Sequence, residues 1–236
     1  MKITLTSIFL IIIVSCSKAQ TGSYLDPGQA YVKLLIDNGG GTQQRIGVYK
    51  VNGTSYLFGE KHTGDLFGKG EKGESVFISY NTYSQQVEFY VSFSQSKPLI
   101  KNLEMVDSFT IKKGKIAEIT KDVHFINGIH LGAKEKGFYQ MIENGKRFKL
   151  YKKYKSNLAV VSTSYAQSDL RQFELEYDYY YTDSTTKKMK KIKHTPYDIK
   201  KEFNFMKDIS NLVDDYSFAQ EPENCLKMVF DSLNNL

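Results

Sequence analysis

The sequence predicts an α+β protein that is mostly β: an antiparallel sheet built from hairpins, as a sandwich or an open barrel, with two short helices at the C-terminus. Aromatic residues are abundant, with 17 tyrosines and 15 phenylalanines among 236 residues, and strands favour such side chains. Apolar and polar residues alternate through much of residues 46–194, and turn-forming pairs separate the runs. After residue 195 the apolar spacing changes from the period of a strand to that of a helix. A composition of 41% hydrophobic and 25% charged residues excludes the disordered and fibrous classes.

Residues 1–19 are typical of a secretory signal peptide. A lysine precedes the apolar run Ile8–Val14, which is too short for a stable membrane span because a span needs about 20 apolar residues. No second hydrophobic segment follows it. We therefore expect an exported protein that is periplasmic or attached to the outer membrane by a lipid.

Two cleavage patterns overlap at the end of this signal. Residues Ile13–Cys16 resemble a bacterial lipobox, which would end the signal peptide at residue 15 and make Cys16 the lipidated first residue of the mature chain. Residues Ser17–Ala19, followed by a glutamine, resemble the small-x-small site of ordinary signal peptidase. We favour lipidation at Cys16, with plain release as the alternative.

The cysteine content and the net charge bear on disulfides and on the kind of partner. Cys16 and Cys225 are the only cysteines, so a processed chain has no intramolecular disulfide, and Cys225 lies in an apolar pattern that predicts a buried, unreactive side chain. Loss of residues 1–19 removes two lysines and no acid, which lowers the formal net charge from +6 to +4. We interpret this mild basicity as a solvated surface, with weak attraction to anionic lipid or polysaccharide as the alternative, and expect no nucleic-acid partner.

The first half of the chain after the signal contains several expected strands. Residues 20–45 hold two turn signals around a short apolar piece and are interpreted as a linker or an edge strand. Residues 46–51 alternate, and Asn52-Gly53 then predicts a hairpin with Tyr56–Phe58, because both residues of such a pair tolerate the positive φ of a type I′ turn. Further strands are expected over residues 75–80, 87–93, 103–111 and 123–126.

The second half of the predicted β region, which ends at residue 194, contains the clearest hairpin. It covers Gly137–Lys155, and its alternating halves meet at Asn144-Gly145. A β-branched stretch over 158–163 and a long two-faced strand over 171–181 follow. The five lysines of residues 187–193 predict an exposed edge strand, because charge on an edge prevents pairing with another molecule; a partner-binding patch is the alternative.

Two helices are expected within residues 195–236, and we expect both to pack on the sheet. Thr195 is a suitable N-cap, and Pro196 fits the first helical position. Pro222 opens the second helix in the same way. The apolar stripes are Ile199, Phe203 and Met206 in the first helix, and Cys225, Leu226, Val229, Phe230 and Leu233 in the second.

One short string resembles a nucleotide-binding motif. Residues Gly68–Gly73 match G-x-G-x-x-G, which holds a pyrophosphate only when it follows a strand and opens a helix. The residues that follow, 74–80, have a strand pattern instead. We therefore interpret the string as a charged hairpin loop and assign no cofactor.

Two groups of residues could act as metal ligands or as acid and base. His62 lies between Glu60 and Asp65 in a loop-like segment, and His124 and His130 flank Asn127-Gly128 with Asp122 nearby. Neither group has the spacing of a zinc signature. The first group has no second histidine, and the second would need a third ligand from elsewhere in the chain. We interpret both groups as polar decoration and assign no catalytic or metal-binding residue.

Hydroxyl groups, acids and tyrosines near the long strand offer weaker candidates. Residues Ser162–Ser164 lack a nucleophile elbow, and His194 lies beside a helix cap. The acids Glu174, Glu176 and Asp178 alternate with aromatic residues, as on any half-solvated strand. The row Tyr177, Tyr179 and Tyr181, with Tyr180 behind it, is either a platform for stacking on sugars or a sheet face covered by the terminal helices, and we favour the covered face.

The arrangement of these segments resembles that of small uncharacterised exported proteins and lipoproteins of Bacteroidetes bacteria. The shared features are the lipobox-like Ile13–Cys16, the early and central hairpin signals, and the lysine-rich strand that precedes the terminal helices. The resemblance implies a cell-envelope location and a β-rich fold, and no particular activity. Surface-displayed lipoproteins of that group usually carry acids directly after the lipidated cysteine, whereas Ser17–Gln20 has none, which favours an anchor that faces the periplasm.

We therefore expect a non-enzymatic binding or structural module of the cell envelope. Its partner would be an envelope protein, a polysaccharide or a lipid, with membrane contact only through the lipid anchor. The alternative is a periplasmic hydrolase or metal-dependent enzyme. That alternative requires His62 with Glu60 and Asp65, or His124 with His130, to gather in a concave pocket.

Overall fold

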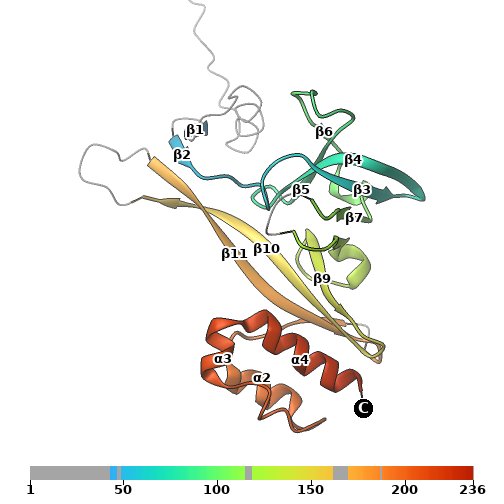
Figure 1. The fold of residues 1–236 in the computed structure, drawn as a ribbon, viewed down its shortest axis with the longest axis vertical. Coiled ribbons are helices and arrows are strands. Elements are labelled where there is room, and N and C mark those ends of the chain that lie inside the picture. Colours follow the sequence, from blue (N-terminus) through green and yellow to red (C-terminus); the bar gives the residue numbers. More distant parts are fainter. Residues whose placement is uncertain (1–42, 47–48, 115–118, 162–169, 187, 236) are drawn as a thin grey trace, which may run out of the picture.

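The computed structural model describes residues 43–46, 49–114, 119–161, 170–186 and 188–235 (Figure 1). The predicted signal peptide, Cys16 and residues 20–42 lie outside these ranges. The strands are β1 Gln43–Ile46, β2 Tyr49–Asn52, β3 His62–Gly68, β4 Glu71–Asn81, β5 Gln86–Tyr90, β6 Leu99–Ile100, β7 Ser108–Ile111, β8 Val123–Asn127, β9 Phe138–Asn144, β10 Phe148–Val160, β11 Leu170–Asp183 and β12 Lys188–Lys191. The helices are the 3-10 turns η2 Leu103–Met105 and η3 Gly128–Leu131 and the α-helices α2 Pro196–Phe203, α3 Asp215–Gln220 and α4 Pro222–Asn234.

The described strands form one sheet in the order β1-β2-β11-β10-β9-β8-β7-β3-β4-β5-β6, and β12 adds to β11. Neighbouring strands are antiparallel, except that β2 runs parallel to β11. The sheet curls back on itself. A hydrogen bond of 3.1 Å shows this: the Ser156 amide of β10 donates to the carbonyl of Thr82, directly after β4, although β4 and β10 are not neighbours in the sheet order. The predicted α+β class, mostly β, is confirmed.

The two largest apolar cores lie along the long β10–β11 hairpin. Inside the curled sheet, Phe109 and Phe125 stack with ring centroids 4.6 Å apart, and Phe138 meets Phe109 edge-on. At the far end of the hairpin, the helices cover the sheet through contacts such as that of Phe148 with Phe230. Figure 1 shows the hairpin running from the β2 edge to the three helices, with β3 to β7 curled beside it. The hairpin therefore contributes to both cores.

The two predicted C-terminal helices are present, although the first ends at Phe203, so Met206 of its expected stripe lies beyond the helix. The Thr195 Oγ1 accepts a hydrogen bond from the Asp198 amide and caps α2, and Pro196 is its first residue. The five stripe residues of α4 are all buried. A third helix, α3, lies between them; the sequence analysis did not predict it, because six residues are too few to show a clear helical period.

The predicted hairpin at Asn52-Gly53 is wrong. Gly53 does have a positive φ of 80°, but β2 pairs with β1 and with β11, whereas Tyr56 forms a bridge with Asn81. Val51 is fully buried in a small cluster that includes Phe173 of β11. Burial against a distant strand therefore outweighs the local turn preference.

The hairpin β9–β10 is confirmed, and the end of helix α4 holds its turn. The Asn234 Oδ1 accepts from the amides of Arg147 at 3.1 Å and Phe148 at 2.8 Å, and the Asn234 Nδ2 donates to the Phe148 carbonyl at 3.0 Å. Gly145 lies directly beneath this side chain, because a Cβ at that position would come within 1.8 Å of the Asn234 Nδ2. The end of α4 therefore packs closely on the β9–β10 turn, and the position of Gly145 has no room for a larger side chain.

Two further segments differ in detail from their expected form. Residues Leu103–Met105, expected to start a strand, form the turn η2, and the strand β7 begins only at Ser108. The lysine-rich β12 pairs with β11 and has no second neighbour among the described strands, so the expected edge strand is present. None of the helices in the described ranges combines the length and apolar character that crossing a bilayer needs.

Candidate functional site

The residues around His62 do not converge. The buried His62 places its Nε2 3.1 Å from the Gly59 carbonyl, whereas Asp65 lies at an odd-numbered offset on the same strand, β3, and pairs with Lys112 at 2.8 Å. Glu60 is exposed to solvent. Because side chains at odd offsets point to opposite faces of a strand, His62 and Asp65 cannot share a ligand here.

The second histidine group is also separated. The His124 Nδ1 is 2.9 Å from the Thr110 Oγ1, and burial lowers the pKa of His124. His130 lies on η3 and contacts Asp107 at 2.9 Å, while the Asp122 carboxylate accepts from the Lys113 amide. Within the described ranges, no three His, Cys, Asp or Glu side chains are arranged to hold a metal ion.

The tyrosines of the row Tyr177, Tyr179 and Tyr181 are either buried or in contact with a lysine of the chain. Tyr179 and Tyr181 are buried in the core beneath the helices. Tyr177 is 40% exposed, but the Lys152 Nζ lies 4.2 Å from its ring centroid and pairs with Glu223 of α4 at 3.1 Å. The chain's own lysine therefore takes the place that a stacked ligand would occupy.

The remaining sequence candidates do not form a site either. Glu174 and Glu176 are exposed, and His194 lies 3.7 Å from Asp178. Residues 162–164 lie outside the described ranges. Cys225 is buried in α4, and burial raises the pKa of its thiol, so the reactive thiolate form is disfavoured.

The glycine string does form the wall of a pocket. Strand β3 ends at Gly68 and β4 begins at Glu71, and Lys69 and Gly70 both have positive φ, as a two-residue hairpin turn requires. The next residues continue as a strand, so the string opens no helix. Its role in the fold is a charged hairpin that borders a hollow.

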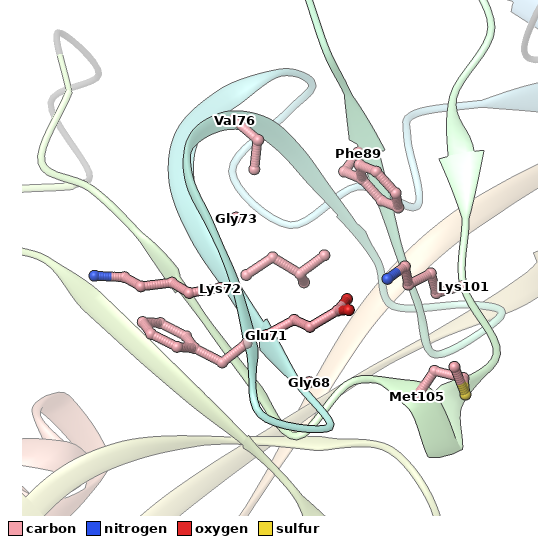
Figure 2. A pocket seen from close by; sticks show the side chains of 10 residues that line it. Gly68, Glu71, Lys72, Gly73, Val76, Phe89, Lys101 and Met105 are labelled. Atoms are coloured by element: carbon pink, nitrogen blue, oxygen red, sulfur yellow. The ribbon is translucent and has the colours of Figure 1, made fainter.

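This hairpin pocket has a volume of about 180 Å³. Its floor is apolar and comes from Leu66, Val76, Phe89 and Met105. Figure 2 shows the Glu71 carboxylate and the Lys101 amine pointing toward each other across the opening, while Lys72 points away from it. A ligand group that enters would meet an apolar floor and one charge of each sign at the rim.

At the β5–β6 end of the sheet, exposed apolar side chains lie on both faces, and we call them together the edge surface. Val91 is 74% exposed and Phe93 66% exposed, although Phe93 packs edge-on against Phe77. The Lys61 amine donates to the carbonyls of Phe93 and Gln95 and so fixes this loop. The edge surface consists of Val91, Phe93, Leu99, Ile100 and Met105.

Behind the edge surface, β5 carries a buried carboxyl group. Glu88 is 1% exposed, accepts a hydrogen bond from the Tyr56 hydroxyl at 2.7 Å and lies 3.4 Å from the Asn81 amide nitrogen. Burial raises the pKa of Glu88, with the charge of Glu60 adding to the effect, while the two hydrogen bonds oppose it. The group ties the segment before β3 to the β4–β5 hairpin.

Comparison of the chain with protein-family models, curated proteins and solved structures finds no significant match. The function therefore has to follow from the residues of the chain. Sequence reasoning singled out the glycine string but not Phe89, Lys101 or Met105, which complete the pocket. They lie on separate elements with no spacing pattern to link them, and only the curl of the sheet brings them together.

Proposed function

We propose that the protein is an exported cell-envelope protein that works as a binding module, and that the edge surface with the hairpin pocket takes an extended segment of a partner protein. The observation that carries this proposal is the strand β6, which pairs with β5 alone among the described strands and lies beside a pocket: Leu99 pairs with Phe89, and Phe89, Lys101 and Met105 line the pocket. The exposed apolar side chains of the edge surface add area that a partner can cover.

The backbone of β6 supports an extended partner. Within the described ranges β6 pairs with β5 alone and stands at the end of the sheet, far from the helices in Figure 1. A strand at a sheet edge presents unpaired amide and carbonyl groups to an added strand. Peptide segments are recognised in this way, with main-chain hydrogen bonds giving affinity and side-chain pockets giving specificity.

The size of the pocket supports a side chain as its occupant. Sites for free small molecules usually have volumes of about 300–1,000 Å³. The hairpin pocket is smaller, at about 180 Å³, and its floor is apolar. It suits one aliphatic or aromatic side chain of a segment that lies along β6.

Charge supports an acidic segment. Lys97 and Lys101 flank the two residues of β6, and neither forms an ion pair among the described residues. The Lys101 amine faces the Glu71 carboxylate across the pocket rim, so an acidic side chain on the partner would pair with Lys97, just before β6. Such pairs contribute more to specificity and association rate than to affinity.

Filling the pocket is expected to weaken peptide binding by about tenfold or more. In the Gly73→Val variant the new side chain enters the pocket, and the nearest atom to a Cβ there is 3.8 Å away, so the strand accepts it without a clash. The measurement is the dissociation constant of peptides selected from an extended-peptide library on the mature protein. Thr63→Val, an exposed change on β3 outside the pocket, is the matched control. Selected peptides that bind Gly73→Val and the wild type equally would contradict the proposal.

The envelope location has a separate test. Replacing Cys16 by alanine is expected to move the protein from the membrane fraction to the soluble fraction, because two or more acyl chains give stable anchoring and none would remain. The measurement is fractionation of cells that produce each form. Ser17→Ala, which leaves the cysteine in place, is the control. If the Cys16→Ala protein stays in the membrane fraction, the protein is not held there by a lipid on Cys16.

A further inference from the structure

Helix α2 presents aromatic and basic side chains on its outer side. The helix buries Ile199 and Phe203 in the core. Tyr197 and Lys201 are four residues apart, so they share one side of the helix, opposite to the buried residues. Tyr197 is 72% exposed, and Phe205, in the turn directly after the helix, is 78% exposed. We call this surface the α2 face, and it consists of Tyr197, Lys200, Lys201 and Phe205.

The segment that contains the α2 face is strongly basic. Residues 188–207, which include β12 and α2, contain seven lysines and two acids. The following residues, 208–235, contain six acids and one lysine. Lys200 and Lys201 form no ion pair among the described residues. Positive charge is therefore concentrated at β12 and α2.

The two acids of this basic segment already have partners within the fold. Asp198 pairs with the Lys193 amine at 3.1 Å. Glu202 accepts a hydrogen bond from the Tyr181 hydroxyl of β11 at 2.6 Å. The α2 face thus carries a net positive charge that is available to a negatively charged partner.

The aromatic rings of the α2 face suit a lipid surface better than a partner protein. Tyr197 and Phe205 are so exposed that they stand clear of their neighbours and enclose no pocket for a protein side chain. The boundary of a bilayer requires no matching shape, and helices that lie in it bury aromatic rings while their lysines reach the headgroups. A bilayer with anionic lipid also supplies the complementary charge.

We infer that the α2 face binds the surface of a bilayer that contains anionic lipid. The rings of Tyr197 and Phe205 enter the boundary between headgroups and acyl chains, and the amines of Lys200 and Lys201 lie among the lipid phosphates. The helix is already formed and capped by Thr195, so it does not have to fold on the membrane. Two rings and a few lysines give reversible, salt-sensitive binding, which orients the protein and does not replace a lipid anchor. The inference depends neither on the peptide partner nor on lipidation of the chain.

Sedimentation with vesicles tests the requirement for charge. The mature protein, produced without acylation, is mixed at about 0.1 M salt with vesicles of phosphatidylcholine or of an equal mixture of phosphatidylcholine and phosphatidylglycerol. We expect at least about tenfold stronger binding to the mixture, and no difference at high salt. The double change Lys200→Gln and Lys201→Gln should weaken binding to the mixture about tenfold or more. Lys97→Gln with Lys101→Gln removes the same charge beside β6 and should leave binding unchanged.

The absence of tryptophan from the chain allows a test of position. Tyr197→Trp places a single fluorescent reporter on the α2 face, and Phe93→Trp places one on the edge surface, at a residue that is 66% exposed. Vesicles of the mixture with brominated acyl chains should quench the first reporter and not the second. Both positions are exposed, so we expect the melting temperatures to match that of the wild type.

Three results would overturn the inference. The first is equal binding to both kinds of vesicle, and the second is unchanged binding after Lys200→Gln and Lys201→Gln. The third is quenching of Phe93→Trp but not of Tyr197→Trp, which would place the membrane contact at the edge surface. If the protein binds neither kind of vesicle, the α2 face has no affinity for lipid and the inference is wrong.

Discussion

Replacing Gly145 by alanine is expected to lower the free energy of unfolding by about 2–4 kcal/mol. The added methyl group would come within 1.8 Å of the Asn234 Nδ2, so the Asn234 side chain must leave its position. It would then lose its hydrogen bonds to the backbone of Arg147 and Phe148. Each such bond contributes about 0.5–1.5 kcal/mol, and the helix end would no longer be held against the turn. Urea unfolding at equilibrium measures the loss.

A double-mutant cycle identifies the cause. Asn234→Ala removes the same hydrogen bonds without a clash, so we expect it to be destabilising by a similar amount. Once Asn234 is alanine, Gly145→Ala should cost less than about 0.5 kcal/mol, because the atom it would strike is gone. Additive losses from the two changes would show that Gly145 is required for another reason.

Raising the pH from 4 to 7 is expected to destabilise the wild type relative to Glu88→Gln. The pKa of Glu88 is raised in the folded state, so the folded protein holds this proton more tightly than the unfolded chain does. The stabilisation from Glu88 is therefore complete below the ordinary pKa of about 4.5 and is lost as the pH rises through the folded-state value. A pKa raised by one unit corresponds to about 1.4 kcal/mol. The size of the loss reports how strongly burial disfavours the carboxylate.

The measurement is the free energy of unfolding of both proteins from pH 4 to pH 7. Glutamine keeps the shape of Glu88 and can bond to Tyr56 and Asn81, so the contacts of the group are largely retained. Every other titrating group is common to both proteins, and the difference between them isolates Glu88. A difference that stays constant across this pH range would show that the folded-state pKa of Glu88 is not raised.

Local signals predicted the elements whose contacts are local. The β9–β10 hairpin, the long strand β11, the lysine-rich edge strand and the capped helix α2 all form where alternation, turn residues or capping residues indicated. The signal at Asn52-Gly53 failed because Val51 is buried against Phe173, a contact between residues far apart in the sequence. No alternation pattern specifies which distant strand a given strand will join.

The proposed peptide-binding surface was harder to predict than the strands. The hairpin pocket is lined by residues of the glycine string, of β5 and of the η2 region, so no single stretch of the sequence shows it. The sequence pointed to the histidines as candidate metal ligands or acid–base groups, because histidine often has these roles. In the fold, each of them has a different partner.

The parallel contact between β2 and β11 constrains the order in which the protein can fold. Lys50 is aligned with Leu170, so this seam joins two segments that are far apart in the sequence. Strands that follow each other in the chain, such as β9 and β10, close short loops and can form early, whereas remote segments lose more chain entropy when they meet. We therefore expect the β1–β2 ribbon to dock after the antiparallel hairpins have formed.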